Sequence, residues 1–210
     1  MSAVAHIKQY KTGAFYRDEF RGDISWNGYE RNVLLRNEGK DSDGTLQFTD
    51  IAMAVGADDI KDGRGVAIAD FDNDGSLDIV INNSTGDSGD ASKARPALLR
   101  NNIGVRRSWL AIELEGTESN RNGVGALVTI ETGAETQTRL VSAGSGFASQ
   151  NSSRLYFGLG EKKQVGALAV RWPSGRVERF EKIGRKPIGA RQLLSIIEGV
   201  GIQARPLPAK

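Results

Sequence analysis

Short apolar segments separated by glycine-rich turns run along the whole chain and constrain what it can fold into. The 210 residues include 26 glycines. In the first half they separate the strand-like segments VLLRN, GVAIAD, LDIVIN and PALLRN. Apolar segments of this length with turn residues between them are typical of β-strands rather than helices. We therefore predict a mostly β chain, whose length suits one large domain or two small ones.

The second half of the chain continues the pattern, most clearly in residues 109–115. Leu110, Ile112 and Leu114 alternate there with other residues, which is the period of a strand that buries one face. The strand-like segments that follow are ALVTIET, QTRLVSAG, RLYFGLG, GALAVRWP, RVERFEKI and RQLLSIIEG. Only residues 50–58, DIAMAVGAD, predict one or two turns of helix.

Composition and charge exclude several classes of protein. Lys and Arg number 28 and Asp and Glu 26, so the overall charge favours neither nucleic acid nor a membrane surface as a partner. Cysteine is absent, which excludes disulfides, thiol nucleophiles and zinc–thiolate sites. No apolar stretch approaches the roughly 18 residues needed to span a bilayer. The N-terminal residues show no secretory signal.

An acidic loop lies between two strand-like segments in the sequence IADFDNDGSLDIV. Two unit charges about 5 Å apart repel by roughly 3 kcal/mol at an effective dielectric of about 20, so a bound cation would offset a real cost. Ca²⁺ prefers oxygen ligands, which carboxylates at alternating loop positions supply. Here these ligand positions are occupied by Asp70, Asp72, Asp74, the Ser76 carbonyl and Asp78.

The loop differs from an EF-hand in its last positions and in its flanks. Gly75 permits the sharp turn that an EF-hand has at this point, but Ile81 stands where an EF-hand requires glutamate. Its flanks are strand-like, whereas an EF-hand has helices. We therefore predict a short Ca²⁺ loop between two strands. The alternative is an ordinary hairpin turn, which Asp, Asn and Gly favour without any metal.

Several longer segments resemble known families. DGRGVAIADFDNDGSLDIVINN resembles the FG-GAP/VCBS repeat, the Ca²⁺-loop blade of integrin-type β-propellers. SNRNGVGALVTI, SAGSGFASQNSSRLYFGLG and VRWPSGRVERF resemble the ASPIC/UnbV domain that follows such repeats in the cartilage acidic protein family. The resemblance covers about residues 28–199, and relatives usually carry several repeats where this chain has room for one. It implies that the Ca²⁺ ligands are Asp70, Asp72, Asp74, Ser76 and Asp78.

The resemblance also implies a domain organisation and a location. We expect four parts: an N-terminal extension (1–20), a Ca²⁺-binding repeat region shaped like one propeller blade (21–104), a β-sandwich-like ASPIC/UnbV domain (105–200) and a C-terminal arm (201–210). The resemblance implies that this chain acts outside the cytoplasm, in the periplasm or at the cell surface. A single blade leaves unpaired strand edges, which invite pairing with another chain. We therefore expect a non-catalytic, Ca²⁺-stabilised structural or interaction module, docked to another protein in a larger assembly.

Other residues allow alternative functions. A second cation site is one, although solvated loop acids are the favoured interpretation of Asp58, Asp59, Asp62, Asp87 and Asp90. A carbohydrate-binding or adhesion module is another, in which loop acids or Arg171 and Trp172 contact a glycan, although packing of Trp172 under a turn is favoured. A glycosidase would need two carboxylates about 5–9 Å apart across a cleft. Cation ligation explains the acid clusters better, so we expect no catalytic residues. Aromatic residues are not interleaved with the arginines, which argues against single-stranded nucleic acid.

Overall fold

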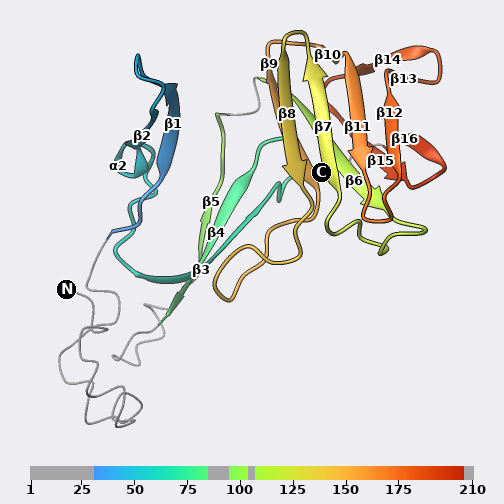
Figure 1. Ribbon diagram of the computed structural model, residues 1–210. Helices are drawn as coiled ribbons and strands as arrows, with labels where there is room; N and C mark the ends of the chain where they lie inside the picture. Colours follow the sequence, from blue (N-terminus) through green and yellow to red (C-terminus); the bar gives the residue numbers. More distant parts are fainter. Residues whose placement is uncertain (1–30, 85–94, 104–106, 206–210) are drawn as a thin grey trace. The chain divides into compact units, whose positions relative to one another are not determined.

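The computed structural model describes residues 31–84, 95–103 and 107–205, and within them it confirms a mostly β chain (Figure 1). Sixteen strands form five small sheets in these ranges, and the helix α2 (Ala52–Val55) spans four residues. It ends at Gly56, whose left-handed φ of 72° is typical of a helix C-terminus. The chain divides into two compact units, Met1–Val66 with Val80–Leu99 and Ala67–Ile79 with Arg100–Lys210.

The first unit contains a hairpin of exposed strands. β1 (Leu35–Lys40) pairs antiparallel with β2 (Leu46–Asp50), and every side chain of both strands is exposed. Asp41 stabilises the turn because its Oδ1 accepts the N–H groups of Asp43 and Thr45, each at 2.9 Å. These hydrogen bonds, the one from Thr45 above all, lower the pKa of Asp41.

A three-stranded sheet holds the strands on either side of the acidic loop. Its order is β3-β4-β5, and its strands are β3 (Asp62–Ala69), β4 (Asp78–Ser84) and β5 (Ala97–Leu99). The acidic loop therefore connects two neighbouring strands of one sheet, as the strand-like flanks predict.

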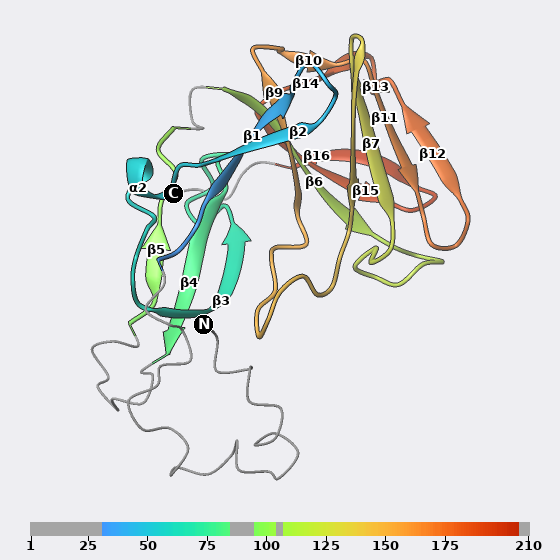
Figure 2. The ribbon, with the colours of Figure 1, turned by 60° about the vertical axis from the view of Figure 1, so that its left-hand side comes forward.

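Two four-stranded sheets form most of the second unit (Figure 2). One has the order β16-β15-β6-β9 and is built from β6 (Ser108–Glu115), β9 (Leu155–Gly160), β15 (Gln192–Ile197) and β16 (Gly201–Arg205). In it β15 runs parallel to β6, and the other pairs are antiparallel. The other, all antiparallel, has the order β12-β11-β7-β8 and is built from β7 (Leu127–Thr132), β8 (Glu135–Leu140), β11 (Ala167–Arg171) and β12 (Val177–Phe180).

The two four-stranded sheets share one hydrophobic core. Leu110 and Ile112 from β6 meet Val128 and Ile130 from β7 and Phe157 from β9, and all five are fully buried. The alternation seen in the sequence of β6 thus points one set of its side chains into this core. Burial of each such side chain contributes about 1.5–3 kcal/mol of transfer free energy.

The opposite face of β6 is buried too, so the expectation of a strand with one buried face is wrong here. Trp109 and Ala111 form a second, smaller cluster with Tyr156 of β9 and Leu193 of β15. Ala111 is completely buried. The acidic loop lies against this face, since a Cβ at Gly75 would be 1.9 Å from Trp109.

Several elements were not predicted from the sequence. They are β2, β10 (Gln164–Val165), β14 (Lys186–Gly189) and β16, and β14 pairs with both β10 and β13 (Lys182–Ile183). β16 uses residues 201–205, the first half of the predicted C-terminal arm. Residues 206–210 and the predicted extension 1–20 lie outside the described residues, and the predicted domain boundaries stay a prediction. Among the described helical residues, none forms a helix long and apolar enough to cross a membrane.

Candidate metal centre

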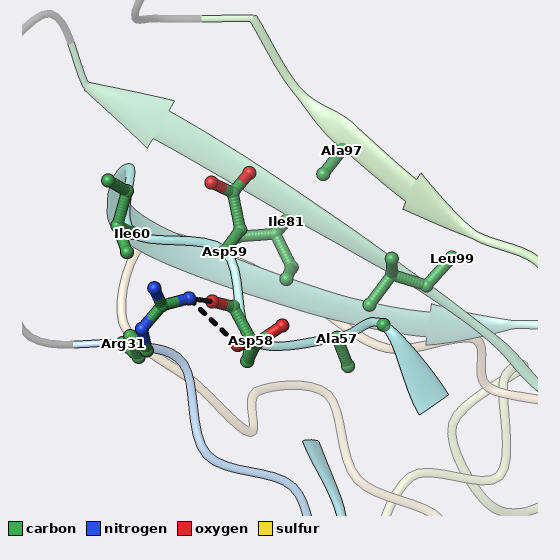
Figure 3. A pocket seen from close by; sticks show the side chains of 9 residues that line it. Arg31, Ala57, Asp58, Asp59, Ile60, Ile81, Ala97 and Leu99 are labelled. Atoms are coloured by element: carbon green, nitrogen blue, oxygen red, sulfur yellow. Dashed lines mark hydrogen bonds and ion pairs between the residues drawn. The ribbon is translucent and has the colours of Figure 1, made fainter. Parts of the chain in front are cut away.

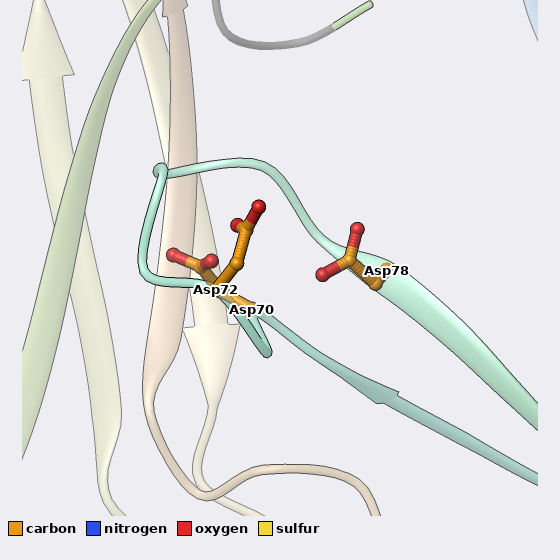
Figure 4. A group of neighbouring side chains, drawn as sticks. All are labelled: Asp70, Asp72 and Asp78. Atoms are coloured by element: carbon orange, nitrogen blue, oxygen red, sulfur yellow. The ribbon is translucent and has the colours of Figure 1, made fainter. Parts of the chain in front are cut away.

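Three carboxylates of the acidic loop converge at the ends of β3 and β4 (Figure 4). One oxygen each from Asp70, Asp72 and Asp78 lies within 4.8 Å of the others. Asp70 and Asp78 are buried, at 8% and 2% exposure, and Asp72 is half-buried. Carboxylates withdrawn from water require hydrogen bonds or a positive charge. The cluster could therefore hold a metal ion.

Backbone N–H groups of the loop and of Asn101 orient the carboxylates of Asp70 and Asp78. Oδ1 of Asp70 accepts the N–H of Asp74 at 3.0 Å, and Oδ2 accepts that of Gly75 at 2.9 Å. Oδ2 of Asp78 accepts the N–H of Phe71 at 3.1 Å, and Oδ1 of Asp78 accepts the N–H of Asn101 at 2.8 Å. Such bonds are what Asp side chains form in turns. They leave other lone pairs on each carboxylate for a cation, since an ionised carboxylate can accept about four bonds.

Asp74 and Ser76, the other two predicted ligands, lie in the same loop but outside the converging group. Oδ1 of Asp74 accepts the Ser76 N–H at 2.8 Å. The Asp74 side chain is 5% exposed, and its Oδ2 lies 3.9 Å from Nη2 of Arg100. The same Arg100 nitrogen pairs with Asp72 at 2.5 Å. Ser76 is buried, and its hydroxyl oxygen has no hydrogen-bond partner. The sequence predicted its backbone carbonyl, and not its hydroxyl, as the Ca²⁺ ligand.

The donor set fits a hard cation. All the converging atoms are carboxylate oxygens. Oxygen-only sets of this kind suit Ca²⁺ and Mg²⁺, whereas zinc and copper sites use imidazole or thiolate ligands. The chain has no cysteine and one histidine, which lies outside the described residues.

The loop also contacts β9 and the residue just before this strand, both far away in the sequence. The Tyr156 hydroxyl donates to Oδ2 of Asp70 at 3.1 Å. Arg154 donates from Nη1 to Oδ1 of Asn73 at 3.2 Å. The sequence analysis missed both residues because 86 positions separate Tyr156 from Asp70 and 81 separate Arg154 from Asn73. The segment RLYFGLG indicates a strand but carries no sign of what its side chains contact.

Comparison with known proteins identifies the part of the chain that includes β9. The profile of the family described as ASPIC and UnbV matches residues 116–202. The chain contains an ASPIC/UnbV domain. It is also distantly similar to cartilage acidic protein 1 of Xenopus tropicalis, at 31% identity over 120 residues, which is 55% of this chain and 17% of that protein.

Two further relatives give the same result. Cartilage acidic protein 1 of Homo sapiens is 30% identical over 117 residues, 55% of this chain and 16% of that protein. Cartilage acidic protein 1 of Mus musculus is 27% identical over 138 residues, 65% of this chain and 19% of that protein. The matched part of the chain thus spans less than a fifth of these curated relatives. The resemblance to the ASPIC/UnbV domain and to this family is confirmed.

A buried glutamate that the sequence analysis missed joins three segments of the ASPIC/UnbV domain. Glu198 is 1% exposed. It accepts the N–H groups of Thr117, Glu118 and Ser119 at 2.7–2.9 Å, and the hydroxyls of Ser119 and Ser174. Desolvation raises its pKa, but these hydrogen bonds outweigh it and lower the pKa to about 2. All the donors are bound to the ionised carboxylate, so this cluster stabilises the domain rather than offering a vacant site.

Trp172 of the ASPIC/UnbV domain has the packing role that the favoured interpretation predicts. Its side chain belongs to the main hydrophobic core and is 2% exposed. The indole Nε1 donates to Oε2 of Glu178 at 2.6 Å. A sugar cannot stack on a ring buried in this way.

The acids considered for a second cation site are paired with basic residues where the structure describes them. Figure 3 shows Arg31 paired with Asp58. In the first unit Asp58 and Asp59 line a pocket of about 350 Å³. Arg31 pairs with Asp58 at 2.8 Å, and Lys61 pairs with Asp59 at 3.1 Å. Desolvation raises the pKa of Asp59, but hydrogen bonds from Lys61 outweigh it and lower the pKa. Asp87, Asp90 and the side chain of Asp62 lie outside the described part of the chain.

Proposed function

We propose that the chain is a non-catalytic structural or protein-interaction module stabilised by Ca²⁺. The observation that carries the proposal is the convergence of Asp70, Asp72 and Asp78 within 4.8 Å in a partly buried loop. A cation there would screen the repulsion among the carboxylates and hold the ends of β3 and β4 together. Ca²⁺ accepts irregular carboxylate shells, whereas Mg²⁺ requires near-octahedral geometry and retains its waters. This difference favours Ca²⁺.

Asp74 and Ser76 complete the proposed ligand set. Two features of the loop support them: the low exposure of the Asp74 side chain, at 5%, and the Ser76 hydroxyl without a partner. A buried polar group without a partner costs about 1–3 kcal/mol. Their role as ligands is the part of the proposal that rests most on resemblance to the FG-GAP/VCBS repeat.

The fold supports a more detailed proposal for both parts of the chain. The strands around the acidic loop would correspond to one propeller blade, since β3 and β4 are neighbours in a small sheet. The ASPIC/UnbV domain would be a β-sandwich, since two four-stranded sheets share one core. We further propose that the module acts outside the cytoplasm, docked to another protein. Apolar side chains of the first unit support such docking, since Val33, Leu35 and Phe48 are 64%, 58% and 53% exposed.

Thermal melting with and without Ca²⁺ tests the proposed function. At a free Ca²⁺ concentration about 100 times the dissociation constant, linkage predicts about 2.7 kcal/mol of added stability. Mg²⁺ at the same concentration should add far less. Asp72→Asn should lose most of the Ca²⁺ response, whereas Asp59→Asn, a change outside the loop, should keep it. A melting temperature that does not respond to chelator in a verified Ca²⁺-loaded sample contradicts the proposal.

A further inference from the structure

The acidic loop covers the face of the sheet β16-β15-β6-β9 that the main core leaves free. Trp109, Ala111, Tyr156 and Leu193 form a separate buried cluster on that face. The loop residue Gly75 lies directly against it, because a Cβ at this position would be 1.9 Å from Cε2 and Nε1 of Trp109. Loop and sheet belong to the same compact unit. The loop is therefore packed on the sheet rather than suspended in solvent.

A chain of polar contacts links the same face to the converging carboxylates. Nε of Arg154 donates to Oε1 of Glu113 at 2.9 Å, which fixes the guanidinium above β6. Nη1 of Arg154 donates to the Tyr156 hydroxyl oxygen at 3.0 Å. The Tyr156 hydroxyl donates in turn to Oδ2 of Asp70 at 3.1 Å, in a buried contact. The sequence of contacts is thus Glu113, Arg154, Tyr156, Asp70.

The chemistry of the groups fixes the direction of these hydrogen bonds. Arginine has only donors, so the Tyr156 oxygen must accept from Arg154, and its single proton is left for Asp70. Asp70 thereby receives a hydrogen bond from outside the loop, in addition to those from the N–H groups of Asp74 and Gly75.

We propose that Tyr156, held by Arg154, is a positioning residue for the metal centre: it fixes the carboxylate of Asp70 so that the ASPIC/UnbV domain sets the cation affinity of the loop. The inference rests on the proposed Ca²⁺ function and extends it to a partner residue outside the loop. By linkage, an effect of the domain on cation affinity implies an equal effect of the cation on the docked state of the loop. Hydrogen-bond partners of metal ligands typically change metal affinity about 10- to 100-fold when they are removed.

Terbium binding to the full chain tests the inference. Tb³⁺ substitutes for Ca²⁺ in oxygen-ligand sites, and its luminescence is sensitised by a nearby indole such as Trp109. Competition between Ca²⁺ and bound Tb³⁺ then gives the Ca²⁺ affinity of the folded chain, at a temperature below its melting point. Tyr156→Phe removes the hydroxyl and keeps the ring, so we expect Ca²⁺ affinity to fall about tenfold or more.

Two further variants make the result specific. Arg154→Lys keeps the positive charge but cannot reproduce the forked contacts, so it should weaken Ca²⁺ binding too. This variant replaces Tyr156→Phe in the test if Tyr156→Phe does not fold. Thr129→Val is the control, because it removes a hydroxyl whose oxygen lies 3.0 Å from that of Thr138. Both residues belong to the sheet β12-β11-β7-β8, so the change should leave Ca²⁺ affinity unchanged.

Each outcome decides between the two claims. If the wild-type chain binds Ca²⁺ and both the Tyr156 and Arg154 variants bind it equally well, the positioning role is wrong while the Ca²⁺ function stands. A lower melting temperature without a change in Ca²⁺ affinity also overturns the positioning role, since it shows a structural contact only. If the wild-type chain binds no Ca²⁺ at all, the proposed function fails and the positioning role fails with it.

Discussion

Replacing Gly75 by alanine should strongly destabilise the chain because the loop backbone lies against an indole. Gly75 has a φ of 91°, and alanine pays about 1–2 kcal/mol to adopt a left-handed conformation. Its Cβ would also lie 1.9 Å from Trp109, where non-bonded carbon atoms sit at roughly 3.5–4 Å. The loop or the indole must therefore move by about 1.6 Å or more. Overpacking of this kind costs about 1–3 kcal/mol, so we expect a total loss of about 2–5 kcal/mol.

Gly175→Ala is the matched control for this change. Gly175 has a φ of 93°, almost that of Gly75, but a Cβ there meets no atom within 4 Å. It should therefore lose only the conformational part, about 1–2 kcal/mol. Urea denaturation of both variants, followed by circular dichroism, measures the free energies of unfolding. Equal losses in the two variants would refute the packing of the acidic loop on Trp109.

Two other predictions concern the ASPIC/UnbV domain. The pKa of Glu198 is lowered from 4.5 to about 2 in the folded chain, so its stabilising effect is present above pH 4.5 and is lost as the pH falls toward 2. Glu198→Gln should therefore lower the melting temperature at pH 7 and weaken its fall in acid; a pH series of melts with an unchanged slope would contradict this. Ile130→Ala should cost about 2–5 kcal/mol of unfolding free energy because Ile130 is fully buried. Val177→Ala, at a side chain that is 66% exposed, should stay within about 0.5 kcal/mol of wild type, and similar losses in these two variants in urea would argue against the described core.

Local patterns explain what the sequence predicted well. β6, β7, β11 and β15 carry apolar residues at strand spacing, and each lies within a predicted segment. The converging carboxylates were predicted for the same reason, since their spacing within one short loop brings them together. β2 was missed although Leu46 and Phe48 alternate with polar residues, because a pattern of only two apolar positions is too short to predict a strand.

Contacts between distant segments explain what the sequence could not predict. Glu113 suggests a solvent-exposed second face for β6, but it pairs with Arg154 at 2.8 Å, and the loop covers the same face at Trp109. Nothing near Tyr156 in the sequence indicates that its hydroxyl contacts Asp70. Only the folded arrangement of the strands brings these residues together. The three carboxylates that converge in the loop were thus readable from the sequence, and the distant residues that contact the loop were not.

The most direct test of the central claim is isothermal titration of Ca²⁺ into the chelator-stripped full chain. The account predicts one Ca²⁺ bound per chain at the acidic loop, and loss of that binding in a variant with Asp70→Asn and Asp78→Asn. These changes keep the size of both side chains and remove two of the three converging carboxylates. The absence of Ca²⁺ binding in the wild-type chain, or equal binding in the double variant, would contradict the account.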